Sequence, residues 1–148
     1  MESALEKYII DHSTPEDPIL QDLYRQTYLR FVNPNMVSGH LQGKLLELIS
    51  KMVNPGFVLE IGTFTGYSAI CLARGLKPGG KLITIEINDE LAAFSKGYFE
   101  KAGLSESIEL FNGNSDFSVP DYRFKENPSP PQAPAQNNRN LRKAINPL

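Results

Sequence analysis

The sequence contains one cysteine, two histidines and no tryptophan. The lone Cys71 excludes an intramolecular disulfide and a cysteine-based metal cluster, which fits a reducing compartment. No apolar run approaches the roughly 20 residues that a membrane-spanning helix requires. The first ten residues form a charged amphipathic stretch and lack the basic start and apolar run of a signal peptide. These absences predict a cytoplasmic protein that does not cross a membrane.

The chain also lacks a strong charge of either sign. Its formal net charge is −2 over 148 residues, and no basic run is interleaved with aromatic residues. This pattern gives no indication of a nucleic-acid-binding surface. With 41% apolar residues, the chain is long enough to bury a core as an ordinary globular domain.

Three zones of different pattern follow one another along the chain. Residues 1–53 predict an N-terminal helical region, and residues 54–116 alternate short apolar strands with helices. Residues 117–148 contain six of the 11 prolines and only scattered apolar residues. Because proline can neither continue a helix nor fill a central strand, this last zone is expected to be a disordered tail.

Three helices are expected in the first zone. The first ends near His12, and a turn rich in proline and acidic residues precedes the second. The third begins near Ser38, a favourable N-cap. Apolar side chains recur at helical spacing on the second helix (Leu20, Leu23, Tyr24, Thr27, Phe31) and on the third (Leu41, Leu45, Leu48, Ile49, Met52).

The second zone reads as strand, helix, strand, helix, strand. Strands are expected over 57–61, 82–85 and 107–111, with helices over 67–74 and 88–102 between them. Right-handed crossovers then make the sheet parallel, with the strands adjacent in the order 3-2-1. The expected fold class is therefore α/β and Rossmann-like.

The junction between the first strand and the next helix carries the most informative motif, Glu60-Ile-Gly62-Thr-Phe-Thr-Gly66-Tyr-Ser68. Glycines at the end of a strand and the start of a helix let the backbone approach a ligand closely. The Glu-x-Gly-x-x-x-Gly spacing differs from the Gly-x-Gly-x-x-Gly of dinucleotide-binding enzymes. The helix start therefore favours an amino-acid carboxylate over a pyrophosphate.

Polar groups around this motif match one small molecule. Ser68 can add a hydroxyl to the carboxylate site, and Glu60 can receive an ammonium group. Glu86, which ends the second strand, can accept both hydroxyls of a ribose. S-adenosylmethionine carries all three complementary groups. Simpler structural alternatives are a tight turn for the glycines, and solvated strand ends for the two carboxylates.

Residues 5–116 resemble the cation-dependent O-methyltransferases, the group that includes catechol and caffeoyl-CoA O-methyltransferases, and especially their bacterial members. The resemblance depends on five blocks, at residues 12–17, 36–43, 59–68, 84–86 and 112–115. It implies a Rossmann-like methyltransferase fold that binds S-adenosylmethionine.

The same resemblance implies a role for individual residues. Met36 and Ser38 would flank the methionine end of the cofactor. Its amino-acid portion would be held by Glu60, Gly62, Thr63 and Ser68, with Gly66 shaping the loop, and its ribose by Glu86. The adenine would be bordered by Gly113, Asn114 and Ser115, and Asn114 departs from the Asp or Ala usual in the family.

After Ser115 the resemblance stops. The family continues with a fourth strand, an acidic motif that binds a divalent metal, a substrate-activating lysine and a later Asp-Asn pair. None of these maps onto residues 117–148. The tail reads as if a conventional gene had lost its second half through truncation or a shifted reading frame. We therefore expect neither metal ligands nor catalytic residues here, weak cofactor binding at best, and no methyl transfer by the chain alone.

The leading hypothesis is thus an S-adenosylmethionine-dependent O-methyltransferase fragment whose family methylates a hydroxyl of a small, catechol-like aromatic. The alternative is a non-catalytic cofactor-binding or protein-interaction module. An NAD-type oxidoreductase fragment is disfavoured by the glycine spacing. The strand at residues 57–61 should form an exposed sheet edge, which favours self-association or a homodimer.

Overall fold

The computed structural model describes residues 4–113, and Asn114, Ser115 and the expected tail at 117–148 lie outside this range. The chain first forms three helices and a single 3-10 turn: α1 (Ala4–Asp11), α2 (Pro18–Arg30), η1 (Pro34–Met36) and α3 (Gly39–Val53). It then alternates strands and helices: β1 (Phe57–Ile61), α4 (Tyr67–Ala73), β2 (Lys81–Glu86), η2 (Asp89–Leu91), α5 (Ala92–Lys101) and β3 (Ile108–Asn112).

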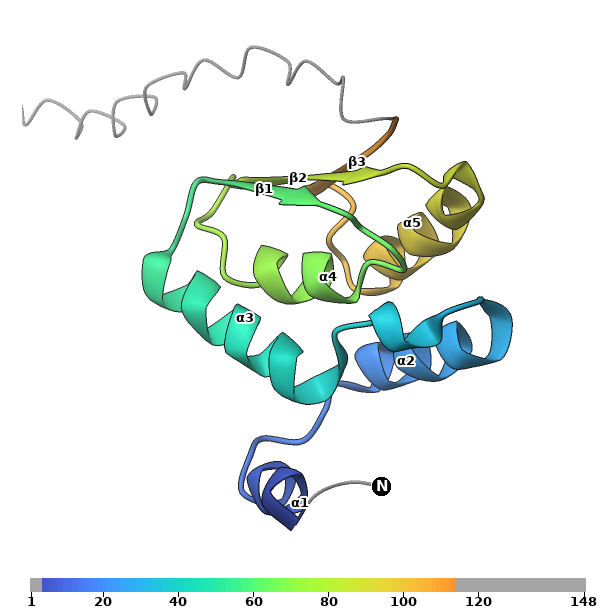
Figure 1. The fold of residues 1–148 in the computed structure, drawn as a ribbon. Helices are drawn as coiled ribbons and strands as arrows, with labels where there is room; N and C mark the ends of the chain where they lie inside the picture. Colours follow the sequence, from blue (N-terminus) through green and yellow to red (C-terminus); the bar gives the residue numbers. More distant parts are fainter. Residues whose placement is uncertain (1–3, 114–148) are drawn as a thin grey trace, which may run out of the picture. The chain divides into compact units, whose positions relative to one another are not determined.

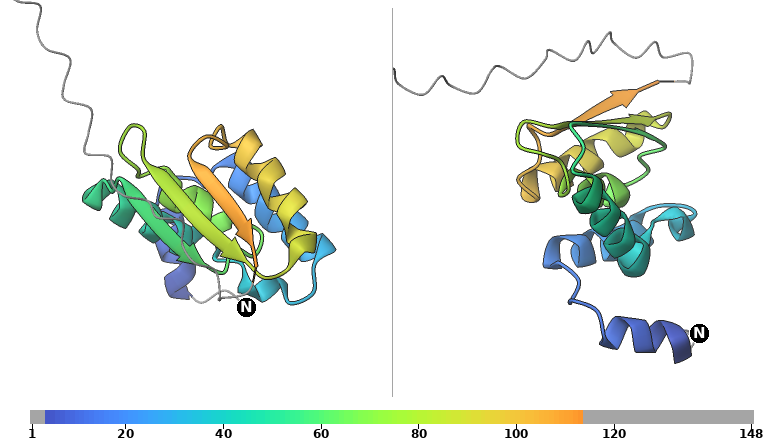
Figure 2. Two further views of the ribbon diagram at one scale, coloured as in Figure 1. Left: turned by 90° about the horizontal axis from the view of Figure 1, so that it is seen from above. Right: turned by 90° about the vertical axis from the view of Figure 1, so that its left-hand side faces the viewer.

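The three strands form one parallel sheet in the order β1-β2-β3. This confirms the expected strand order and the α/β Rossmann-like class. Figure 1 shows α4 and α5 against one face of the sheet, with α2 and α3 beyond them; Figure 2 shows the strands side by side. Within the register, Glu60 pairs with Thr84, and Glu86 pairs with Asn112. The carboxyl ends of β1 and β2 therefore meet at one edge of the sheet.

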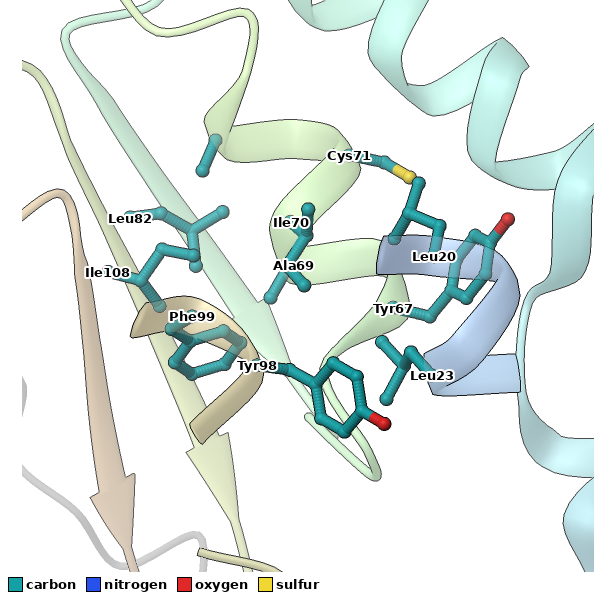
Figure 3. Packing of buried hydrophobic residues seen from close by; sticks show 11 residues of the cluster. Leu20, Leu23, Tyr67, Ala69, Ile70, Cys71, Leu82, Tyr98, Phe99 and Ile108 are labelled. Carbon is teal, nitrogen blue, oxygen red and sulfur yellow. The ribbon is translucent and has the colours of Figure 1, made fainter. Parts of the chain in front are cut away.

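The buried core lies between the sheet and α2, α4 and α5 (Figure 3). Ala69 and Ile70 of α4 lie between Leu82 and Ile108 of the strands and Leu23 of α2. Burying one large apolar side chain stabilises the fold by roughly 1.5–3 kcal/mol. Helix α4 has five buried residues and contacts both the strands and α2, so it is the central element of the core. On α2 the expected inward positions are confirmed for Leu20, Leu23 and Thr27, whereas Tyr24 is partly exposed.

Most of the apolar stripe expected on α3 does not face the described core, and only Leu41 of its five members is partly buried. Leu45, Leu48 and Ile49 are exposed, and Met52 is 77% exposed. The inward face of α3 carries Gly43 and Ser50, which are buried, and Leu46, which packs against the core. The Ser50 hydroxyl donates to the Leu72 carbonyl of α4 at 2.6 Å. A Cβ on Gly43 would lie 2.5 Å from the Tyr67 ring, so close helix approach decides which face of α3 is buried.

Strand β1 lies at an edge of the sheet formed by the described residues, as the sequence predicts. Two of its apolar side chains reach solvent, since Leu59 is 44% and Ile61 78% exposed. No helix within residues 4–113 combines the length and the apolar character needed to span a membrane.

Candidate functional site

The loop between β1 and α4 adopts an unusual backbone that its glycines permit. Gly62, Phe64 and Gly66 have positive φ angles of 92°, 49° and 90°. A Cβ on Gly62 would meet nothing within 4 Å, whereas a Cβ on Gly66 would lie 2.6 Å from the Phe99 ring. Gly66 is therefore required for packing against α5, and Gly62 leaves open space beside the loop.

A small hollow of ≈ 90 Å³ lies beside this loop. One part of its lining comes from the segment before α3, and the other part from the loop and the first turn of α4. The structure brings together five of the site residues expected from the sequence, Met36, Ser38, Gly62, Thr63 and Ser68. Four further residues line the hollow that the sequence pattern does not indicate as site residues: Val37, Phe64, Thr65 and Tyr67. Two segments that are separated in the sequence by α3 and β1 thus share one concave surface.

Glu60 lies at the base of the loop and is held by side-chain hydroxyls from two different elements. Its Oε1 accepts a hydrogen bond from Ser68 of α4, and its Oε2 accepts one from Thr84 of β2, both at 2.6 Å. Burial raises the pKa of this carboxyl, while the two hydrogen bonds act in the opposite direction. Within residues 4–113 no lysine, arginine or histidine forms an ion pair with Glu60.

Glu86 is held by backbone groups instead. Its Oε2 accepts the Phe64 N–H at 2.7 Å and its Oε1 accepts the Asn88 N–H at 2.9 Å. The residue is only 8% exposed. Each carboxylate oxygen has a second lone pair, so further hydroxyl donors can still be accepted. Because Phe64 lines the hollow, this bond joins the end of β2 to the candidate site.

Some residues that the sequence predicts to contact a ligand are hydrogen-bonded to other protein groups instead. The Ser68 hydroxyl donates to Glu60, so in this arrangement its proton is not directed at a ligand carboxylate. The Thr63 side chain is buried and lies 2.5 Å from the Thr84 hydroxyl, which leaves only its backbone at the hollow. Gly113 donates its N–H to the Glu86 carbonyl at 3.0 Å and so lies beside the end of β2.

Thr84 is the polar residue that sequence reasoning missed. It occupies the middle of β2 and is completely buried, yet it contacts both Thr63 and Glu60. A signal was available, because a parallel register pairs residues at equivalent positions of β1 and β2. That register places a hydroxyl-bearing residue directly beside Glu60.

The described residues do not fit a metal site. Among residues 4–113 no three His, Cys, Asp or Glu side chains lie close enough together to hold an ion. A larger cavity of ≈ 640 Å³ opens between α1, α2 and the start of α3, and it shares Ser38 with the hollow. Neither Glu60 nor Glu86 lines either space directly, but each is hydrogen-bonded to a residue that lines the hollow, Glu60 to Ser68 and Glu86 to Phe64. The glycine loop, together with these links to both strand-end carboxylates, therefore identifies the smaller hollow as the candidate site.

Comparison with known proteins gives a consistent result. Residues 10–128 match the O-methyltransferase family. Mouse catechol O-methyltransferase is 31% identical over 126 residues, which cover 84% of this chain and 47% of that protein. The chain thus spans about half the length of the curated relatives that it matches.

Solved structures give the same picture. An O-methyltransferase from Bacillus cereus, in complex with SAH, is 31% identical and superposes with a TM-score of 0.66 over 76% of this chain and 51% of its own. The O-methyltransferase TomG from Streptomyces achromogenes, involved in tomaymycin synthesis and in complex with SAM, is 34% identical. Its TM-score is 0.70 over 76% of this chain and 50% of its own.

Proposed function

Because this chain belongs to the O-methyltransferase family, we propose that the hollow beside the β1–α4 loop binds the methionine end of S-adenosylmethionine. In this proposal Glu60 receives the ammonium group, and Glu86 accepts the ribose hydroxyls. Met36, Ser38, Gly62 and the backbone of Thr63 surround the amino-acid portion. Gly113 borders the adenine with the two residues that follow it, Asn114 and Ser115.

The observation that carries this proposal is the pair of carboxylates at the ends of adjacent parallel strands, on either side of a glycine loop. Ligands of open α/β sheets bind at the carboxyl ends of the strands. Glu60 is a partly buried carboxyl whose pKa is raised by burial, and it forms no ion pair with a cationic side chain among the described residues. An ammonium group would stabilise its charged form, as a cation within about 4–6 Å does.

For the whole protein we propose methyl transfer to a hydroxyl of a small aromatic of the catechol type. The cofactor, when bound, supplies an electrophilic methyl group on a sulfonium sulfur. The described residues bind and orient this donor, and alignment of reactants alone contributes several kcal/mol to such displacements. They contain no metal site and no lysine or histidine in the hollow. We therefore propose that residues 4–113 bind the cofactor and do not catalyse transfer by themselves.

Calorimetric titration of the full chain with S-adenosylhomocysteine tests this proposal. We expect saturable binding, no binding of NAD, and about tenfold or greater weakening in Glu60→Gln, because the negative charge that pairs with the ammonium group is lost. Arg74→Gln, which removes an ion pair with Asp17 at the opposite end of α4 from the hollow, serves as a matched control with unchanged affinity. Binding that is absent in the wild type, or equal in Glu60→Gln, would refute the assignment.

The exposed edge strand favours a second candidate, an interaction module that pairs through β1. Unpaired strand edges with apolar side chains promote association between copies. Analytical ultracentrifugation over a range of concentrations should then show a dimer in the wild type, and less of it in Ile61→Lys. A concentration-independent monomer would eliminate this candidate and leave the cofactor proposal intact.

A further inference from the structure

Four polar side chains form a continuous hydrogen-bonded chain beneath the glycine loop. Thr63 lies 2.5 Å from Thr84, Thr84 donates to Glu60 at 2.6 Å, and Ser68 donates to the other oxygen of Glu60 at 2.6 Å. Thr63, Thr84 and Ser68 come from the loop, from β2 and from α4. Glu60 is thus clamped between the sheet and the helix.

The direction of this chain follows from the chemistry of its members. An ionised carboxylate only accepts hydrogen bonds, so the single proton of the Thr84 hydroxyl is committed to Glu60. The short Thr63–Thr84 contact then requires Thr63 to be the donor. The protons therefore all point toward Glu60, and such directed chains strengthen each member in a buried setting.

Strand stability does not explain the presence of a hydroxyl at position 84. Valine has a similar shape and an equally high β propensity, and it would bury no polar group. The neighbouring inward positions on the same face, Leu82 of β2 and Val58 of β1, are indeed apolar. The hydroxyl at this buried position is used by Glu60 and by Thr63, the two residues that it contacts.

We propose that Thr84 is a positioning residue for cofactor binding: its hydroxyl, oriented by Thr63, holds the Glu60 carboxylate in the rotamer that receives the ligand's ammonium group. This inference rests on the proposed function of the site. Thr84 is completely buried whereas Glu60 is only partly buried, so Thr84 acts through Glu60 and makes no contact with the ligand.

Few titratable groups lie on the elements around Glu60, so a change in the pH dependence of binding can be attributed to this residue. On β2 the other titratable group on the same face is Glu86, two residues beyond Thr84. On α4 the titratable side chains are Tyr67 and Cys71, and burial raises the pKa of both, so they stay neutral over the acidic range of the test. Arg74 follows the last residue of α4 and is paired with Asp17. On β1 no other residue is charged.

Titration of the full chain with S-adenosylhomocysteine, in Thr84→Val and Thr84→Ser, tests the inference. We expect Thr84→Val to weaken binding about tenfold and Thr84→Ser to restore affinity close to that of the wild type. Loss of a donor to the charged form raises the pKa of Glu60. The pH at which affinity declines on acidification should therefore be higher in Thr84→Val than in the wild type.

A double-mutant cycle separates positioning from a general structural effect. If Thr84 acts through Glu60, Thr84→Val should have no further effect on affinity in the Glu60→Gln background. Thr63→Val provides a second test should Thr84→Val fail to fold, with a smaller loss and a shift of the pH profile in the same direction. Wild-type affinity in these valine variants, or a loss that persists in Glu60→Gln, overturns the inference. Absence of binding by the wild type instead refutes the proposed function.

Discussion

The carboxyl ends of β1 and β2 carry the same functional group in two different environments. Glu60 of β1 is held by the hydroxyls of Ser68 and Thr84, whereas Glu86 of β2 is held by the N–H groups of Phe64 and Asn88. A hydroxyl can rotate and become an acceptor, but a backbone N–H can only donate. Glu60 is therefore oriented by side-chain hydroxyls, which could reverse their role if the carboxylate were replaced, whereas Glu86 is oriented by backbone donors that cannot.

The largest expected effect comes from altering the loop that supplies the backbone donor to Glu86. Gly66→Ala combines a positive φ of 90° with a Cβ 2.6 Å from the Phe99 ring. We expect it to lower the free energy of unfolding by about 3 kcal/mol, the sum of a left-handed backbone penalty and overpacking. Thermal unfolding monitored by circular dichroism measures this loss.

Gly62→Ala is the matched control in the same loop. It has the same sign of φ but open space at its Cβ, so the expected loss is only about 1 kcal/mol. Because Gly62 lines the hollow, this variant should weaken binding of S-adenosylhomocysteine more than it weakens folding. Equal destabilisation by the two alanines would show that the Phe99 contact does not constrain the loop.

Glutamine substitutions compare the two carboxylates directly. In Glu86→Gln an NH₂ group replaces one oxygen and leaves a backbone N–H without an acceptor, at a cost of about 1–3 kcal/mol. In Glu60→Gln the facing hydroxyl can reverse its role, so we expect a change below about 1 kcal/mol. Denaturant unfolding of both variants gives the two values, and a larger loss in Glu60→Gln would contradict the comparison.

The pH dependence of stability provides a smaller effect with a definite sign. Burial raises the pKa of Glu60 above its ordinary value of 4.5, so the folded state binds this proton more tightly than the unfolded state does. The contribution of Glu60 to stability is then fully present below pH 4.5 and declines as pH rises through the folded-state pKa. The melting temperature of the wild type, relative to Glu60→Gln, should accordingly fall as pH rises from 4 to 7. A relative increase would contradict the stated direction.

The smallest expected signal is proton release on ligand binding. An ammonium group beside Glu60 favours its charged form, so binding of S-adenosylhomocysteine near the pKa of Glu60 should release a fraction of one proton. Calorimetry in two buffers with different ionisation enthalpies measures this fraction. Release should disappear in Glu60→Gln, and its persistence there would place the titrating group elsewhere.

Much of the local structure could be read from the sequence. The sequence pattern predicts the helices of the first zone, the three strands and their order, and it places Glu60 and Glu86 near strand ends, as the structure confirms. Short apolar runs and glycine junctions carry this information because they act locally. The buried face of α3 was not predictable in the same way. Its apolar stripe indicated Leu45 and Leu48, but α4 packs against Gly43 and Ser50.

The sequence by itself determined the family, the parallel strand order and the position of two carboxylates at the carboxyl ends of strands. Only the tertiary structure decided what each carboxylate contacts. The hydroxyl of Thr84 and the N–H of Phe64 lie 24 and 22 residues from their carboxylate partners, and both bonds are shorter than 3 Å. Such contacts depend on strand register and on the positive φ angles of one loop, which chain folding establishes and local pattern does not encode.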